Sequence, residues 1–168
     1  MGRFRYRRRR MHPAVIAAGA GLMLVAAAHS HAGTAAPAAH AAAAPSHAAS
    51  VAVAFARAQI GKPYQWGATG QGAFDCSGLV QAAWSAAGVS IARTSQNQWA
   101  TERHIPASQA AAGDLVFYPG ADGTWTAPGH VAMVSGPGQM IEAYATGYPI
   151  RETLIRSGAV GFTDPEPS

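Results

Sequence analysis

The stretch FDCSGLV, residues 74–80, joins a loop to a helix. The loop before it is rich in glycine and aromatic residues, and after it apolar residues recur at helical spacing until Gly88 supplies a stop. Asp75 suits the N-cap position, because its carboxylate can accept hydrogen bonds from backbone N–H groups of the first turn. We therefore predict a helix that begins at Cys76 and ends before Gly88.

Cys76 is the one cysteine of the chain. At the first position of a helix, free backbone N–H groups and the positive end of the helix dipole stabilise a thiolate, the nucleophilic form of cysteine. The alternative is a buried cysteine that packs as a small apolar side chain. Helix placement alone leaves both interpretations open, so the neighbouring chemistry has to decide.

The rest of the chain divides into a helical part and a strand part. Residues 51–60 contain no glycine or proline and are followed by Gly-Lys-Pro, which predicts a first helix that stops there. Beyond Gly113 the pattern changes to short β-type runs separated by glycine and proline. Helices followed by hairpin strands predict an α+β fold, with N-terminal helices packed on an antiparallel β-sheet. The expected strands are 115–118, 130–135, 139–145, 150–155 and 159–163.

A length of 168 residues fits one domain with appendages. We assign residues 51–168 to the folded domain. Residues 33–50 hold only small and polar residues with histidine, which cannot bury enough surface to order a chain, and they are expected to form a flexible leader. His40 and His47 in this leader have no cysteine, aspartate or glutamate nearby, so no metal site is expected there.

Residues 1–32 have the three parts of a secretory signal peptide. An arginine-rich start is followed by an apolar run at 14–28 and by small residues suited to cleavage before Gly33. The alternative is a membrane anchor, but a run of about 15 residues, mostly alanine and glycine, is short for a hydrocarbon core about 30 Å thick. We expect a secreted or cell-wall-associated protein without stable membrane insertion after cleavage.

The pI of about 9.7 comes from the N-terminus and is no sign of nucleic-acid binding. Six of the twelve basic residues are arginines between positions 3 and 10. After residue 32, six basic residues stand against eight acidic ones, a formal net charge of −2. Without a basic stripe the counter-ion release that drives nucleic-acid binding has no source, so neither DNA nor RNA is an expected partner.

Two histidines lie beyond residue 50. His104 sits in the polar sequence TERHIP and is predicted to be a surface loop residue, whereas His130 follows Pro128-Gly129 and opens a strand. An imidazole on a strand that faces a cysteine at a helix start can take the thiol proton and later donate it to a leaving amine. This favours His130 as the base.

Glu142 is the candidate for the group that orients this imidazole. It lies twelve residues after His130, beyond a Gly136-Pro137-Gly138 turn, and has apolar neighbours. If the hairpin is centred on Gly136, positions 130 and 142 stand opposite each other, with their side chains on one face and β-carbons about 5 Å apart. A carboxylate there can hold the imidazole.

Several motifs resemble those of the NlpC/P60 peptidases in order and spacing, over residues 51–160. An Asp-Cys-Ser-Gly core with a downstream Gly-His-Val is far more specific than either part alone. The motifs are Tyr64-Gln65-Trp66-Gly67, Phe74-Asp75-Cys76-Ser77-Gly78-Leu79-Val80, Arg93-Thr94-Ser95 with Gln98, Gly113-Asp114-Leu115-Val116-Phe117 and Gly129-His130-Val131.

This resemblance implies a papain-like fold and a cell-wall hydrolase that acts on peptidoglycan stem peptides, often between D-glutamate and diaminopimelate or lysine. It implies a Cys76, His130 and Glu142 triad, in which glutamate stands where the family often has histidine. No cofactor or metal is implied, and we expect a monomer.

The same resemblance implies roles for residues around the triad. Tyr64 would help to bind the oxyanion. Asp75 could pair with a free L-alanine amine, or act only as the helix cap, and the two roles are compatible. The residues implied to line the substrate pocket are Trp66, Asp75, Ser77 and Ser95.

Other functions use the same residues. An amidase that cuts the sugar-to-alanine bond, or an acyltransferase that passes the thioester to an amine, would need the same triad. A non-catalytic wall-binding module is a different class, and such modules usually lack the nucleophile or the base, both of which are present here. Product analysis separates these alternatives.

Overall fold

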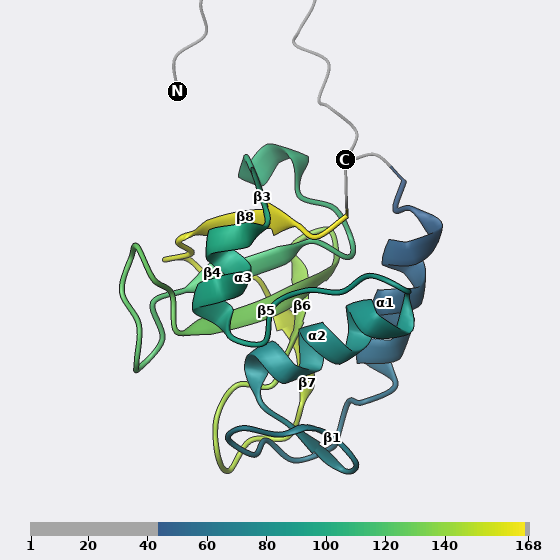
Figure 1. The fold of residues 1–168 in the computed structure, drawn as a ribbon, viewed down its shortest axis with the longest axis vertical. Coiled ribbons are helices and arrows are strands. Elements are labelled where there is room, and N and C mark those ends of the chain that lie inside the picture. Colours follow the sequence, from purple (N-terminus) through teal and green to yellow (C-terminus); the bar gives the residue numbers. More distant parts are fainter. Residues whose placement is uncertain (1–43, 167–168) are drawn as a thin grey trace, which may run out of the picture. The chain divides into compact units, whose positions relative to one another are not determined.

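A computed structural model describes residues 44–166, which form an α+β fold with the helices beside an antiparallel sheet (Figure 1). The predicted fold class is confirmed. The predicted signal peptide and the predicted leader up to residue 43 lie outside the described residues. The helices are α1 (His47–Arg57), α2 (Cys76–Ala86), α3 (Ser95–Thr101) and the short 3-10 helix η1 (Ala107–Gln109). The strands are β1 (Thr69–Gly70), β2 (Ala73–Phe74), β3 (Arg103–Ile105), β4 (Leu115–Tyr118), β5 (His130–Gly136), β6 (Gln139–Glu142), β7 (Arg151–Leu154) and β8 (Gly161–Asp164).

Helix α1 begins four residues earlier than predicted, at His47 instead of Val51. Ser46 caps it, because its hydroxyl accepts a hydrogen bond of 2.9 Å from the N–H of Ala49. Ala49, from the predicted leader, continues the buried stripe formed by Ala52, Val53 and Ala56, and these small side chains let α1 pack closely against α2. The last four residues of the predicted leader therefore belong to the folded domain.

The main sheet has six antiparallel strands in the order β3-β8-β4-β5-β6-β7. Side chains alternate between its two faces, as the period of two requires. Odd-numbered residues of β4 and β5 pack against α1 and α2 in the main core. Even-numbered residues of the same strands form a second, smaller cluster on the other face. The second cluster consists of Val116, Tyr118, Ala132, Val134, Met140 and Phe162.

Residues 155–160 connect β7, at one edge of the sheet, to β8 on the far side of β4. Ile155 and Ala159 pack against the second cluster, so the connection runs over that face. The hydroxyl of Tyr118 accepts from the N–H of Arg156 at 3.2 Å and lies 3.3 Å from its carbonyl oxygen. These contacts hold Arg156 next to the strands that carry His130 and Glu142.

The elements that were not predicted are the short strands β1 and β2, helix α3, strand β3 and the 3-10 helix η1. Thr94 caps α3 through the N–H of Asn97, and β3 pairs with β8. His104 is exposed, as expected, but it lies on the edge strand β3 and its Nε2 is 2.7 Å from the carbonyl oxygen of Trp99. Among residues 44–166, no helix combines the length and apolar character that a membrane crossing requires.

Candidate active site

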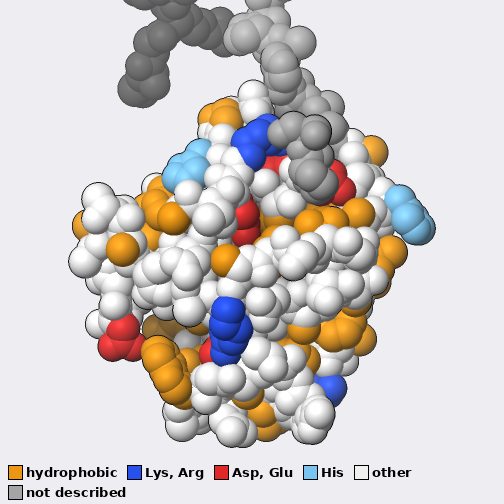
Figure 2. All heavy atoms as spheres, viewed as in Figure 1, with side chains coloured by type: hydrophobic (Ala, Val, Ile, Leu, Met, Phe, Trp, Pro, Cys, Tyr) orange, Lys and Arg blue, Asp and Glu red, His pale blue; other side chains and the backbone are white. Residues whose placement is uncertain are grey.

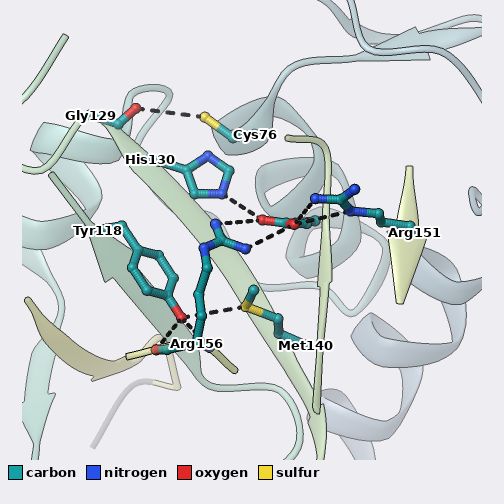
Figure 3. Close-up of polar contacts among 8 residues, drawn as sticks. Cys76, Tyr118, Gly129, His130, Met140, Arg151 and Arg156 are labelled. Carbon is teal, nitrogen blue, oxygen red and sulfur yellow. Dashed lines mark hydrogen bonds and ion pairs between the residues drawn. The ribbon is translucent and has the colours of Figure 1, made fainter. Parts of the chain in front are cut away.

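Cys76 occupies the first position of α2, as predicted. Asp75 is the N-cap, and its Oδ1 accepts from the N–H of Gly78 at 2.7 Å. The thiol is nearly buried, and Sγ lies 3.9 Å from the carbonyl oxygen of Gly129, the residue that precedes β5 (Figure 3). The first turn of the helix therefore delivers the sulfur to the start of the strand that carries His130.

Gly78 allows the preceding loop to close over this helix start. A β-carbon at position 78 would lie 2.3 Å from the carbonyl oxygen of Ala68, far inside van der Waals contact. The same oxygen accepts the N–H of Asp75 at 3.0 Å. The glycine of the Asp-Cys-Ser-Gly sequence thus permits a backbone contact that fixes the cap and the cysteine beside it.

His130 is the first residue of β5 and is 6% exposed. Its Nε2 lies 2.9 Å from Oε2 of Glu142. Figure 3 shows the side chain of Cys76 next to the other ring nitrogen, so the imidazole lies between the thiol and the carboxylate. Burial lowers the pKa of His130, but hydrogen bonding to Cys76 and Glu142 outweighs burial, and the pKa is raised above its ordinary value.

Glu142 is fully buried at the end of β6, yet it is ionised. Burial raises its pKa, but hydrogen bonds from His130, Arg156 and Arg151 reverse this and hold the pKa at about 2. A carboxylate in this state accepts the ring N–H of His130 and stabilises an imidazolium. The expected contact between positions 130 and 142 is present.

The predicted register of the β5–β6 hairpin is wrong, although the contact it was meant to explain exists. Met133 pairs with Ile141 and Val134 with Met140, which places Glu142 two residues from the position opposite His130. The turn closes at Gly136 and Gln139, and a β-bulge lies between Val134 and Gly136. Diagonal neighbours two positions apart share a face, so the side chains still meet.

Two arginines that were not predicted complete the surroundings of Glu142. Arg151 stands opposite Glu142 on β7, and its Nε and Nη2 donate to Oε1 at 3.2 and 3.0 Å. Arg156 donates to both oxygens, from Nη1 to Oε1 at 3.0 Å and from Nη2 to Oε2 at 2.8 Å. Residues 143–150 connect β6 to β7, and a connection of this length does not fix the strand register, so sequence spacing alone did not reveal the pairing of Arg151 with Glu142.

A cleft of about 410 Å³ opens onto the thiol and the imidazole. Three aromatic side chains wall it, from Tyr64, Trp66 and Tyr144, and Trp66 is 73% exposed. Burial, and next the negative charge of a Cys76 thiolate, raise the pKa of Tyr64, so its hydroxyl stays a hydrogen-bond donor. The remaining lining residues are Gly120, Ala121, Asp122, Gly129, Ala145 and Thr146.

This geometry can support nucleophilic acyl transfer. The cleft gives a carbonyl carbon access to the sulfur, His130 can move a proton, and Glu142 can stabilise the charged ring. A second cavity of about 360 Å³, between the start of α1 and the end of β8, contains none of the predicted site residues. No cluster of three or more potential metal ligands occurs within residues 44–166.

Comparison with known proteins identifies the family to which this fold belongs. The model of the NlpC/P60 family matches residues 61–160. The chain belongs to the NlpC/P60 family. A protein of Corynebacterium glutamicum named probable endopeptidase is 48% identical over 98 residues, which cover 58% of this chain and 44% of the relative. RipB of Mycobacterium tuberculosis, named a peptidoglycan endopeptidase, is 36% identical over 118 residues, 62% of this chain and 47% of the relative.

Solved structures of NlpC/P60 proteins share the fold. The peptidoglycan hydrolase RipB of Mycobacterium tuberculosis aligns with a TM-score of 0.62 and 33% identity over 72% of this chain and 66% of that one. The P60 domain of antigen MAP1204 from M. avium subspecies paratuberculosis aligns with a TM-score of 0.59 and 34% identity over 69% and 92%. The chain spans under half the length of the two curated relatives above.

The other residues that the NlpC/P60 resemblance implied do not all meet at the cleft. Trp66 lines it, but Asp75, Ser77 and Ser95 are buried and lie outside its lining. Asp75 forms a two-bond ion pair with Arg93, at 3.0 and 2.6 Å, and its Oδ2 also accepts from the N–H of Gly67. A substrate amine would therefore have to displace the guanidinium to reach this carboxylate.

The surface of this NlpC/P60 domain carries mixed charge. Figure 2 shows blue and red side chains scattered among uncharged ones, with no continuous basic patch on the face drawn among the described residues. This distribution agrees with the net charge of the chain beyond residue 32.

Proposed function

We propose that this chain is a secreted cysteine endopeptidase that hydrolyses peptidoglycan stem peptides, at the bond between D-glutamate and diaminopimelate or lysine. The observation that carries the proposal is the imidazole of His130, which lies beside Cys76 on one side and 2.9 Å from Glu142 on the other. The relatives named for peptidoglycan endopeptidase activity support the choice of substrate class.

The first half of the reaction forms a thioester. The thiolate of Cys76 attacks the carbonyl carbon of the scissile bond, and the charge that develops on oxygen is met by the Tyr64 hydroxyl at the cleft wall. His130, protonated by the thiol, then donates its proton to the leaving amine as the carbon–nitrogen bond breaks. Glu142 stabilises the imidazolium through this step.

The second half regenerates the enzyme. His130, now neutral, takes a proton from a water molecule, and the resulting hydroxide attacks the thioester carbon. The carbon–sulfur bond breaks, the acid product leaves, and the proton returns to the thiol. Because each proton transfer uses the same ring nitrogen, the imidazole has to keep one orientation throughout, which is the role proposed for Glu142.

The test is a digest of purified peptidoglycan by the full chain, with the products identified by mass spectrometry. Cleavage after D-glutamate, with a new amine on diaminopimelate or lysine, is the expected result. A stem peptide released from the sugar with a free L-alanine amine would indicate an amidase, and a peptide joined to an added amine would indicate a transferase. A Cys76→Ser protein is the matched control for each product.

A further inference from the structure

We propose that Arg151 and Arg156 are positioning residues of this site, which fix the carboxylate of Glu142 so that Oε2 faces Nε2 of His130. This inference rests on the proposed function, because it concerns how the catalytic imidazole is oriented. Neither arginine lines the cleft, so both would act through Glu142 and not through contact with substrate.

The two guanidinium groups saturate the carboxylate. Oε1 accepts three N–H bonds, two from Arg151 and one from Arg156, while Oε2 accepts one from Arg156 and faces His130. Planar guanidinium forks that reach a carboxylate from two directions fix both its position and its plane. Glu142 therefore has no free rotation with which to turn Oε2 away from the imidazole.

The arginines come from two separate elements, which makes the arrangement rigid. Arg151 belongs to strand β7, and Arg156 to the connection between β7 and β8. The guanidinium of Arg156 lies 4.5 Å from the ring centre of Tyr118 and 5.2 Å from that of Tyr144, and Arg151 lies 5.0 Å from Tyr144. Stacking on these rings holds both forks in place.

Because Glu142 is buried, it needs the positive charges of Arg151 and Arg156 to stay ionised. Glu142 is completely inaccessible to solvent, and a carboxylate in such a position without counter-charges would take up a proton. A protonated carboxyl group donates a hydrogen bond, so it would compete for the ring nitrogen instead of accepting its proton. Two partly exposed arginines thus keep the buried acceptor ionised.

The contacts also predict which arginine matters more. Arg156 binds Oε2, the oxygen that faces His130, whereas Arg151 binds only Oε1. Loss of Arg156 therefore frees the oxygen that holds the imidazole. Arg57 offers a matched control, because it forms an ion pair of 2.7 Å with Glu152 on the same strand as Arg151, and neither Arg57 nor Glu152 lines the cleft or contacts Glu142.

The test is a double-mutant cycle on a defined stem peptide, with full-length Arg156→Gln, Arg151→Gln and Arg57→Gln made in the native and the Glu142→Gln backgrounds. Arg156→Gln is expected to lower kcat about tenfold or more, as loss of an orienting hydrogen bond does, with KM nearly unchanged. Arg151→Gln is expected to lower kcat less. In the Glu142→Gln background neither substitution should lower kcat further, and Arg57→Gln should leave kcat unchanged in both.

If Arg156→Gln fails to fold, Arg156→Lys provides the test, because lysine keeps the positive charge but lacks the planar guanidinium group that donates to both carboxylate oxygens. It is expected to lower kcat as well, since an ammonium cannot bind both oxygens in the same geometry. The proposal is overturned if both arginine variants retain native kcat, or if they lower kcat by the same factor when Glu142 is already glutamine. Failure of the proposed function would appear separately, as hydrolysis of the stem peptide by a Cys76→Ala protein.

Discussion

Nε2 of His130 and Oε2 of Glu142 lie 2.9 Å apart because a β-bulge sets the register between their strands. The turn alone, closed by Gly136 and Gln139, would set a register in which Glu142 points to the opposite face from His130. The extra residue at Ser135 shifts the pairing by one and returns Glu142 to the face of the imidazole. The proposed active site therefore depends on an irregularity in the sheet.

Glu142→Ala should lower kcat clearly, but by less than loss of the nucleophile does. The imidazole loses its partner, while the thiol and the ring remain. The kcat of Glu142→Gln should lie between those of Glu142→Ala and the native protein, because an amide oxygen still accepts the imidazole hydrogen bond but supplies no charge. Steady-state kinetics on a stem peptide measure this. Unchanged turnover in Glu142→Ala would make Glu142 a bystander.

The same substitution should cost stability. Glu142→Ala leaves the guanidinium groups of Arg151 and Arg156 without their shared carboxylate, and since both are about a third exposed, water offsets part of the loss. We expect the free energy of unfolding to fall by about 1 to 3 kcal/mol. Urea unfolding measures it, and the kinetic comparison should be made well below the melting temperature of the variant.

The two histidines should respond differently to removal. His130→Ala is expected to abolish hydrolysis, because no other imidazole lies at the cleft within the described residues. His104→Ala should keep near-native turnover, since His104 is exposed on β3 and stacks on Trp99. Turnover measured for both variants decides the matter. If His130→Ala keeps its activity and His104→Ala loses it, the base is His104 on β3, and the assignment to His130 is wrong.

Much of this site could be predicted because its signals are local. The cap of Asp75 and the position of Cys76 depend on a few adjacent residues, and Pro128-Gly129 marks the start of β5. Glu142 was identified from a register that is wrong by two residues, and the prediction survived because a shift of two keeps the face.

The rest depended on contacts between distant parts of the chain. The alanine-rich start of α1 has the composition of a flexible leader, and it is helical because Ser46 caps it and α2 covers it. Helix α3 is polar and short, and Gln98 fixes it by donating to the carbonyl oxygens of Ala92 and Ser77. Arg151 and Arg156 meet Glu142 only through the β6–β7 register and the following connection, which no local pattern encodes.

Glu102 should make the protein less stable as pH rises. Burial raises its pKa from the ordinary 4.5 to about 7, with the Thr163 hydrogen bond opposing the shift. Because the folded form holds the proton more tightly, stability is full below pH 4.5 and falls as pH rises to about 7. Glu102→Gln should remove this loss, and its stability relative to the native protein should increase by about 1 to 3 kcal/mol between pH 4 and pH 8.

Urea unfolding of Glu102→Gln at several pH values measures the change. Glu152→Gln is the control. The Arg57 hydrogen bond lowers the pKa of Glu152, so the stability of Glu152→Gln relative to the native protein should fall as pH rises. If the difference in free energy of unfolding between Glu102→Gln and the native protein stays constant from pH 4 to pH 8, the pKa of Glu102 is not raised by folding and the prediction is wrong.

The most direct measurement is hydrolysis of a defined stem peptide by folded Cys76→Ala protein, compared with the native chain under identical conditions. A small apolar residue fits the nearly buried first position of α2, so the variant should fold with native circular dichroism. We predict hydrolysis at the rate of buffer alone, because no other thiol is present in the chain. Cleavage of the peptide by folded Cys76→Ala protein would contradict the proposed mechanism.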